Sequence, residues 1–176
     1  MVINFKTVPL LFLFSFLLSA CGTEVSEEEN AFRKNLIDRA LNDENRKLGD
    51  AFLAKNKALD GVVTTASGMQ YRVIKSGDGA QPSYQDRVEV HYEGRLVTGE
   101  VFDSSYTRHK PSIFPLTKVI KGWREALLKM RVGDHWQIYL PAELAYGGTS
   151  PSTEIAANSA LIFKIELLAV IGDESE

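Results

Sequence analysis

Cysteine and histidine are scarce in this chain of 176 residues, which contains one Cys and three His. A single Cys cannot form an intramolecular disulfide. His91, His109 and His135 fall in different predicted elements, without the spacing of a metal-ligand pair. No Ser lies in a Gly-x-Ser-x-Gly turn, and no glycine run matches a phosphate-binding loop. These absences argue against a disulfide scaffold, a metalloenzyme and a serine hydrolase, and we expect no cofactor.

Excess positive charge is absent as well. The chain has 20 Lys and Arg against 23 Asp and Glu, which gives a formal net charge of −3 at pH 7. Because no basic stripe is present to neutralise phosphates, we expect no nucleic-acid partner. The apolar run Val8–Leu18 is interrupted by Pro9 and Ser15 and is shorter than the roughly 20 residues that a membrane-spanning helix needs.

Residues 1–20 are typical of a signal peptide. Lys6 supplies the positive flank, and small residues end the apolar run in Leu18-Ser19-Ala20-Cys21. A Cys directly after small residues resembles the lipobox of bacterial lipoproteins. The resemblance implies cleavage before Cys21 and lipid on that residue, which would hold the protein on a membrane. Gly22 resembles the outer-membrane sorting pattern, so we expect a lipid anchor in the bacterial cell envelope, facing the periplasm. The alternative is an ordinary secreted protein.

The segment after Cys21 is expected to contain a tether and then a helix. Residues 21–30 are polar and acidic and predict a flexible tether. Residues 31–60 are predicted to be helical, with Asn30 as N-cap and apolar residues at three- and four-residue steps. Two readings of this narrow apolar stripe are open. The helix lies on its own domain or acts as a spacer, or it pairs two copies of the chain.

The pattern changes to strands after Gly61. Val88–Glu93 alternates so that Val88, Val90 and Tyr92 share one face. Further strands are predicted at residues 70–74, 136–140 and 160–171, with a helix at residues 120–130 and a long loop at 141–159. This order predicts an α+β domain with a mostly antiparallel sheet over residues 67–171, followed by a tail at 172–176.

Aromatic residues with one neighbouring acid form the remaining candidate site. Each aromatic taken alone fits core packing, and Asp103 fits either a turn or an acceptor for a donor such as Tyr92 or Arg108. Without a nucleophile and base, the set suits an apolar substrate whose reaction needs no proton transfer. The motifs, in order, are His91-Tyr92-Glu93-Gly94, Phe102-Asp103-Ser104-Ser105, Val119-Ile120-Lys121-Gly122-Trp123, Ala145-Tyr146-Gly147 and Leu161-Ile162-Phe163.

This series of motifs resembles the FKBP family of peptidyl-prolyl cis–trans isomerases. The resemblance implies a twisted antiparallel sheet wrapped around one short helix. It implies catalytic roles for Tyr92, Phe102, Asp103, Trp123, Tyr146 and Phe163, and substrate-binding roles for Phe114, Val119, Ile120 and Ile155. Residues 51–56 and 61–64 resemble the N-terminal region of the bacterial macrophage infectivity potentiator type, in which a longer helical domain dimerises the protein. A homodimer through residues 31–60 is therefore one expectation.

The function that the resemblance implies is acceleration of X–Pro bond rotation in folding periplasmic or outer-membrane proteins. The partners would be proline-containing polypeptides, and macrolides such as rapamycin would bind the same pocket. Glu154 and the missing Pro pair at Ile155-Ala156-Ala157 depart from the family pattern and predict a looser, more acidic pocket mouth. The rival function is a chaperone that holds unfolded chains in the same pocket without turnover.

Overall fold

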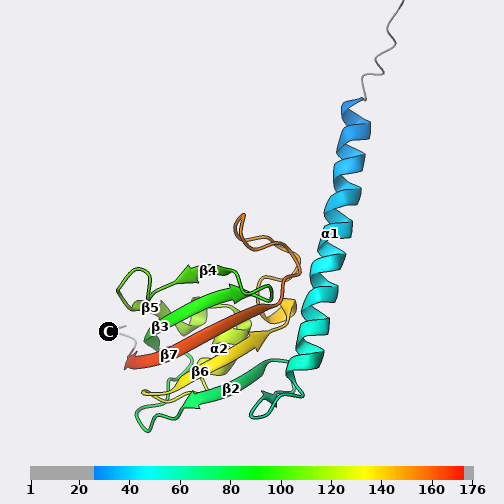
Figure 1. Cartoon of the computed structure of the whole chain (residues 1–176). Coiled ribbons are helices and arrows are strands. Elements are labelled where there is room, and N and C mark those ends of the chain that lie inside the picture. Colours follow the sequence, from blue (N-terminus) through cyan, green and yellow to red (C-terminus); the bar gives the residue numbers. More distant parts are fainter. Residues whose placement is uncertain (1–25, 173–176) are drawn as a thin grey trace, which may run out of the picture.

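A computed structural model describes residues 26–172 of the chain. The predicted signal peptide, Cys21, residues 21–25 of the predicted tether and the tail from residue 173 lie outside the described residues. Figure 1 shows a sheet domain with a long helix that passes one end of it. The sheet confirms the predicted α+β fold.

Seven strands form one sheet, in the order β1-β2-β6-β7-β3-β4, and β5 also pairs with β3. Every pairing is antiparallel. β4 and β5 pair with different halves of β3, both on the side of β3 that faces away from β7. Two separate segments of the chain therefore lie along this edge of the sheet. The strands are β1 Val63–Thr64, β2 Gln70–Lys75, β3 Arg87–Leu96, β4 Val101–Ser104, β5 Ser112–Pro115, β6 His135–Leu140 and β7 Leu161–Ile171.

The main core lies between the sheet and the short helix α2, Lys121–Leu127. The alternation predicted for β3 is confirmed, because Val88, Val90 and Tyr92 are all buried there. Short 3-10 turns at Leu116–Lys118 and Ala142–Leu144 stand at the edges of this core. The sheet therefore curves around a single helix, α2, which carries Trp123. The Trp123 side chain lies near the residues that β3, β4 and β5 contribute to the same pocket.

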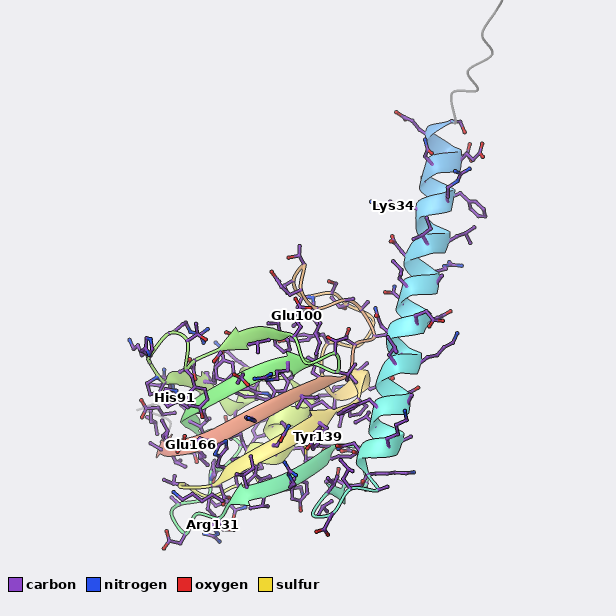
Figure 2. The ribbon with its side chains drawn as sticks, in the orientation of Figure 1. Lys34, His91, Glu100, Arg131, Tyr139 and Glu166 are labelled. Atoms are coloured by element: carbon purple, nitrogen blue, oxygen red, sulfur yellow. The ribbon has the colours of Figure 1, made fainter. Side chains whose placement is uncertain are left out.

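Helix α1, Glu27–Asn56, packs against the opposite face of the sheet through its C-terminal part only. Leu53 is buried against Tyr139, whose side chain lies between β6 and the lower end of the helix in Figure 2. Asn56 donates a hydrogen bond of 2.8 Å to Gln70, and Gln70 donates one of 2.9 Å to the Leu53 carbonyl. The earlier turns, where Figure 2 labels Lys34, stand clear of the domain. None of the helices between residues 26 and 172 is long and apolar enough to cross a membrane.

The structure corrects several sequence-based boundaries. Helix α1 begins at Glu27, and its N-cap is Ser26 and not Asn30, since the Ser26 hydroxyl accepts a 3.2 Å hydrogen bond from the Glu29 amide. The last part of the predicted tether is therefore helical. The sheet begins at β1, ahead of residue 67, and α2 is shorter than the helix predicted over residues 120–130.

Candidate active site

A pocket of about 250 Å³ opens at the end of the sheet where β4, β5 and α2 converge. Its walls come from β3, β4, β5, β7, α2 and the long loop after β6, so the site draws on segments spread over most of the sheet domain. The lining residues are Tyr92, Phe102, Asp103, Phe114, Lys118, Val119, Ile120, Trp123, Tyr146 and Phe163.

Trp123 is the centre of an aromatic cluster that forms the base of the pocket. Its ring is T-shaped to those of Tyr92, Phe114 and Phe163, at centroid distances of 5.1, 5.5 and 5.3 Å. Phe102 in turn stands edge-on to Phe163 at 5.6 Å. Edge-to-face packing of this kind holds rings at favourable angles and leaves few alternative rotamers. The pocket is therefore a preformed apolar surface.

Asp103 is the acidic residue of the pocket, and both of its carboxylate oxygens are occupied. The Tyr92 hydroxyl donates a hydrogen bond to Oδ2, and Arg108 Nη1 forms an ion pair with Oδ1. Arg108 Nη2 also donates to the Tyr92 hydroxyl at 2.9 Å. The three side chains form a closed network in one wall, which confirms the acceptor role weighed for Asp103 from the sequence.

The charge states of these groups follow from that network. Burial raises the pKa of the Tyr92 hydroxyl, and its hydrogen bond to Asp103 adds to the shift. Burial acts to raise the pKa of Asp103, but the hydrogen bonds from Tyr92 and Arg108 outweigh it and the pKa lies below its ordinary value. Asp103 therefore stays charged and Tyr92 stays neutral across the physiological range.

Tyr146 comes from the loop after β6 and has a different environment. Its side chain is 38% exposed at the mouth of the pocket. Burial and the nearby charge of Asp103 raise the pKa of its hydroxyl. Within the described part of the chain this hydroxyl has no hydrogen-bond partner, so it is available to donate to a ligand carbonyl.

The structure brings together all but one of the residues singled out from the sequence. Ile155 is the exception, because it is buried in the main core and is not among the residues that line the pocket. Lys118 lines the pocket but was missed, although it directly precedes Val119 in the sequence. Arg108 was considered only as a partner of Asp103. Arg108 follows Asp103 by five residues across a turn, and this spacing was the sequence signal that it belongs to the same wall of the pocket.

The described residues that line the pocket include no Ser, Thr, Cys or His, so the pocket itself holds no hydroxyl or thiol nucleophile paired with an imidazole base. Each oxygen of its carboxylate already accepts from a donor, and apart from Lys118 its other lining residues are aromatic or aliphatic. Such a site binds an apolar group and orients it through hydrogen bonds, without covalent chemistry or proton transfer. Fold and pocket together define a non-covalent binding domain of the α+β class.

Comparisons with known proteins agree with this class. Residues 79–168 match the family described as FKBP-type peptidyl-prolyl cis-trans isomerase, and residues 19–73 match the domain amino-terminal to it. The chain therefore belongs to the FKBP-type peptidyl-prolyl isomerase family, as the sequence motifs predicted.

Named relatives and a solved structure show how far the similarity extends. The chain is 51% identical over 126 residues to peptidyl-prolyl cis-trans isomerase Mip of Coxiella burnetii, covering 72% of this chain but 55% of that relative. It is 43% identical to the FKBP-type 22 kDa isomerase of Escherichia coli, covering 85% of this chain and 69% of the relative. The crystal structure of FkpA from Escherichia coli aligns with a TM-score of 0.76 and 34% identity, over 85% of this chain and 75% of that one. The chain spans about half the length of the Coxiella protein.

Proposed function

We propose that this protein accelerates cis–trans rotation about X–Pro peptide bonds in proline-containing polypeptides. The observation that carries the proposal is the preformed aromatic pocket over Trp123, with the Tyr146 hydroxyl at its mouth and a carboxylate that is already occupied. Proline is the residue whose ring fits an apolar pocket and whose preceding bond isomerises slowly, over tens to hundreds of seconds.

The barrier explains why such a pocket would act as a catalyst. Resonance makes the C–N bond partly double, and rotation costs roughly 18–20 kcal/mol. The twisted transition state loses this conjugation, so its carbonyl and nitrogen are less polar than in the planar amide. An apolar aromatic pocket solvates the twisted state better than water does relative to the ground state, and only such a differential interaction accelerates the step.

The polar groups would orient the substrate. Tyr146 would donate to a substrate carbonyl and hold the peptide in a turn. Asp103, paired with Arg108 and Tyr92, would hold one wall in place and supply a local field. Because its oxygens are occupied and its pKa is lowered, Asp103 is unsuited to act as a general base. Phe114, Val119 and Ile120 would hold the proline ring and its neighbours.

The decisive measurement is cis-to-trans exchange of a short X–Pro peptide with soluble protein that lacks residues 1–21, with and without rapamycin. We expect Trp123→Leu to lower kcat/KM by at least about tenfold, since it removes the base of the pocket. The matched control is Trp136→Leu, because Trp136 is as buried in the same core but is not a lining residue. It should weaken the fold and retain turnover per folded molecule.

The outcomes separate the rival functions. Acceleration that rapamycin abolishes supports both the enzyme and the pocket. Acceleration without inhibition supports catalysis and points to the altered loop at Glu154–Ala157. If the folded protein does not accelerate exchange but suppresses aggregation of an unfolded chain, the chaperone function replaces the isomerase.

We also propose a lipid anchor on Cys21 that holds the protein at the bacterial outer membrane, facing the periplasm. The support is the Leu18-Ser19-Ala20-Cys21 pattern followed by Gly22. A Legionella longbeachae relative bears the name outer membrane protein MIP. Cys21→Ser should move the full-length protein from the membrane fraction to the soluble fraction. Unchanged fractionation would rule out the anchor.

The exposed half of α1 supports a further proposal, that two copies pair through it. Its apolar side chains Phe32, Leu36, Ile37 and Leu41 are 65%, 48%, 53% and 57% exposed. A helix with so much exposed apolar surface, standing clear of its own domain, gains stability when a second copy covers it.

A further inference from the structure

The loop that carries Tyr146 is held from outside the sheet domain, by helix α1. This loop joins β6 to β7, and its two ends lie beside the lower half of the helix in Figure 1. Contacts from Asn45, Arg46 and Gly49 reach residues near both of its ends. The loop also has hydrogen bonds of its own and buries Ile155, so the contacts from α1 add to these in fixing where its ends lie.

Arg46 joins the two ends of the loop to each other. One guanidinium nitrogen forms an ion pair with Glu143, in the 3-10 turn that opens the loop. The other donates a 2.9 Å hydrogen bond to the side-chain oxygen of Asn158, near the loop's end. These partners are about a hundred residues away along the chain, so the contact exists only in the folded protein.

Both partners of Arg46 are tied to the backbone beside Tyr146. The amide of Gly147, the residue after Tyr146, donates to the Ala142 carbonyl at 2.8 Å, next to Glu143. The carbonyl of Gly147 accepts from the Asn158 amide at 2.7 Å. Asn158 has a positive φ of 59°, a conformation that its side-chain contact helps to hold. The Arg46 guanidinium therefore holds Glu143 and Asn158 together, and the backbone next to each of them is hydrogen-bonded to Gly147, the residue after Tyr146. We call these contacts of Arg46 the clamp.

Packing beside Arg46 fixes the distance between helix and loop. A Cβ on Gly49 would lie 2.8 Å from the Ala160 Cβ, so glycine permits a close approach that no other residue would allow without a shift. Asn45 donates a 3.3 Å hydrogen bond to the Ala157 carbonyl. Glycine in a helix interior is less stable than Ala, and the close contact with Ala160 supplies the reason for Gly49 in α1.

The ion pair itself is exposed, with 44% of the Arg46 side chain and 58% of the Glu143 side chain open to solvent. Exposed pairs contribute little to global stability. The effect of the pair on the position of the loop ends is separate from its effect on stability, since a misplacement of about 1 Å in a positioning group can lower the rate by a large factor.

We infer that Arg46 is a positioning residue for Tyr146, so that helix α1 sets how well the pocket holds its ligand. The expected change in turnover rests on the proposed isomerase function. The claim that Arg46 holds the loop in position does not depend on catalysis. Through this clamp, a segment outside the sheet domain becomes part of the determinants of substrate affinity.

The test compares Arg46→Ala with Lys47→Ala in soluble protein lacking residues 1–21. Lys47 is the matched control because it is the next residue, is exposed and, among residues 26–172, forms its ion pair with Glu44 on the same helix. We expect Arg46→Ala to lower kcat/KM about threefold to tenfold, mostly through a higher KM, and to weaken rapamycin binding to a similar degree. Denaturant midpoints of both variants should stay close to that of the parent protein.

Two further readouts separate positioning from a general structural role. Hydrogen exchange at the Gly147 and Asn158 amides should speed up in Arg46→Ala and not in Lys47→Ala. The charge swap Arg46→Glu with Glu143→Arg should restore KM and amide protection toward parent values, while Arg46→Glu alone should not. Unchanged exchange at both amides, or an unchanged KM in an active enzyme, would overturn the inference. If the parent protein has no turnover, the proposed function fails, and amide exchange still decides this inference.

Discussion

Asp103 shows how a single carboxylate can be kept charged without serving as a base. Tyr92 and Arg108 both donate to it, and the resulting network closes one wall of the pocket. The pKa of Asp103 is lowered, while burial raises the pKa values of Tyr92 and Tyr146. Asp103, Tyr92 and Tyr146 are therefore not expected to change their charge near neutral pH.

We expect kcat/KM for an X–Pro peptide to be flat from about pH 5 to pH 9, between the ordinary pKa values of about 3.9 for Asp and 10 for Tyr. Because the folded-state pKa of Asp103 is lowered, its network stabilises the fold above about pH 3.9, and this contribution is lost as the pH falls through the folded pKa. Exchange rates measured at constant ionic strength provide the check. A sigmoid dependence centred between pH 5 and 8 would show that a proton transfer contributes.

Gly94 illustrates a residue whose missing side chain shapes the pocket. A Cβ there would lie 2.5 Å from the outer edge of the Phe102 ring and 2.9 Å from Phe163. Both rings belong to the pocket wall, so the glycine in the His91–Gly94 motif provides the room in which they pack edge to face.

We expect Gly94→Ala to turn the Phe102 ring out of place and to lower kcat/KM about tenfold or more, since a small misplacement of a positioning group has large effects on rate. Peptide exchange and rapamycin titration measure both consequences. Gly172→Ala is the control, because a Cβ there meets no neighbour within 4 Å. Parent-like affinity in Gly94→Ala would mean that Phe102 is not needed where it stands.

Helix α2 places Trp123 because its first turn can approach the sheet closely. A Cβ on Gly122 would lie 2.3 Å from a Leu140 methyl carbon, and Leu140 is fully buried. The glycine beside Trp123 therefore sets the distance between α2 and β6, and with it the height of the indole in the pocket.

Replacing Gly122 by Ala should lower the free energy of unfolding by about 1–3 kcal/mol through overpacking, despite the better helix propensity of Ala. Denaturant titration measures this effect, and Lys121→Ala at the exposed neighbouring position is the control. If Gly122→Ala stabilises the protein, the close contact with Leu140 does not limit the packing of α2.

Helix α1 bears on the two readings that the sequence left open. Its C-terminal half, from Asn45 to Asn56, packs on its own domain through Leu53 and through the hydrogen bonds of Asn56 and Gln70. Its N-terminal half is exposed over its apolar residues. The first reading is therefore confirmed for the lower half, and pairing of two copies remains a prediction for the upper half.

For the molecule as a whole, the oligomeric state is the property that tests this division. We expect Ile37→Glu with Leu41→Glu to convert a dimer to a monomer, because buried charges would face each other across the paired helices. Sedimentation equilibrium of the protein lacking residues 1–21 measures the mass. Asn35→Glu is the control at an exposed polar position. A parent protein that is already monomeric would contradict the dimer.

The strand faces and the helices could be predicted from local patterns, whereas the aromatic residues of the pocket were assigned from the resemblance to a known family. Alternation along β3 reports which side is buried, because side-chain direction reverses at every residue of a strand. The start of α1 was misplaced because Glu27–Glu29 resemble a tether, although acidic residues also favour the first turn of a helix. β4 and β5 were missed because each is only four residues long and is defined by pairing with β3.

The family resemblance implied that Tyr92, Trp123 and Tyr146 would meet in one site, and the structure shows all three lining the pocket. Residue type and spacing predicted the α+β class, because it depends on burial patterns along the chain, and the resemblance of the motifs to a known family supplied most of the lining residues. The burial of Ile155 in the core, the position of Lys118 in the pocket wall and the contacts of Arg46 with Glu143 and Asn158 depend on contacts between distant segments. Such contacts arise only when packing brings the segments together, and local periodicity carries no information about them.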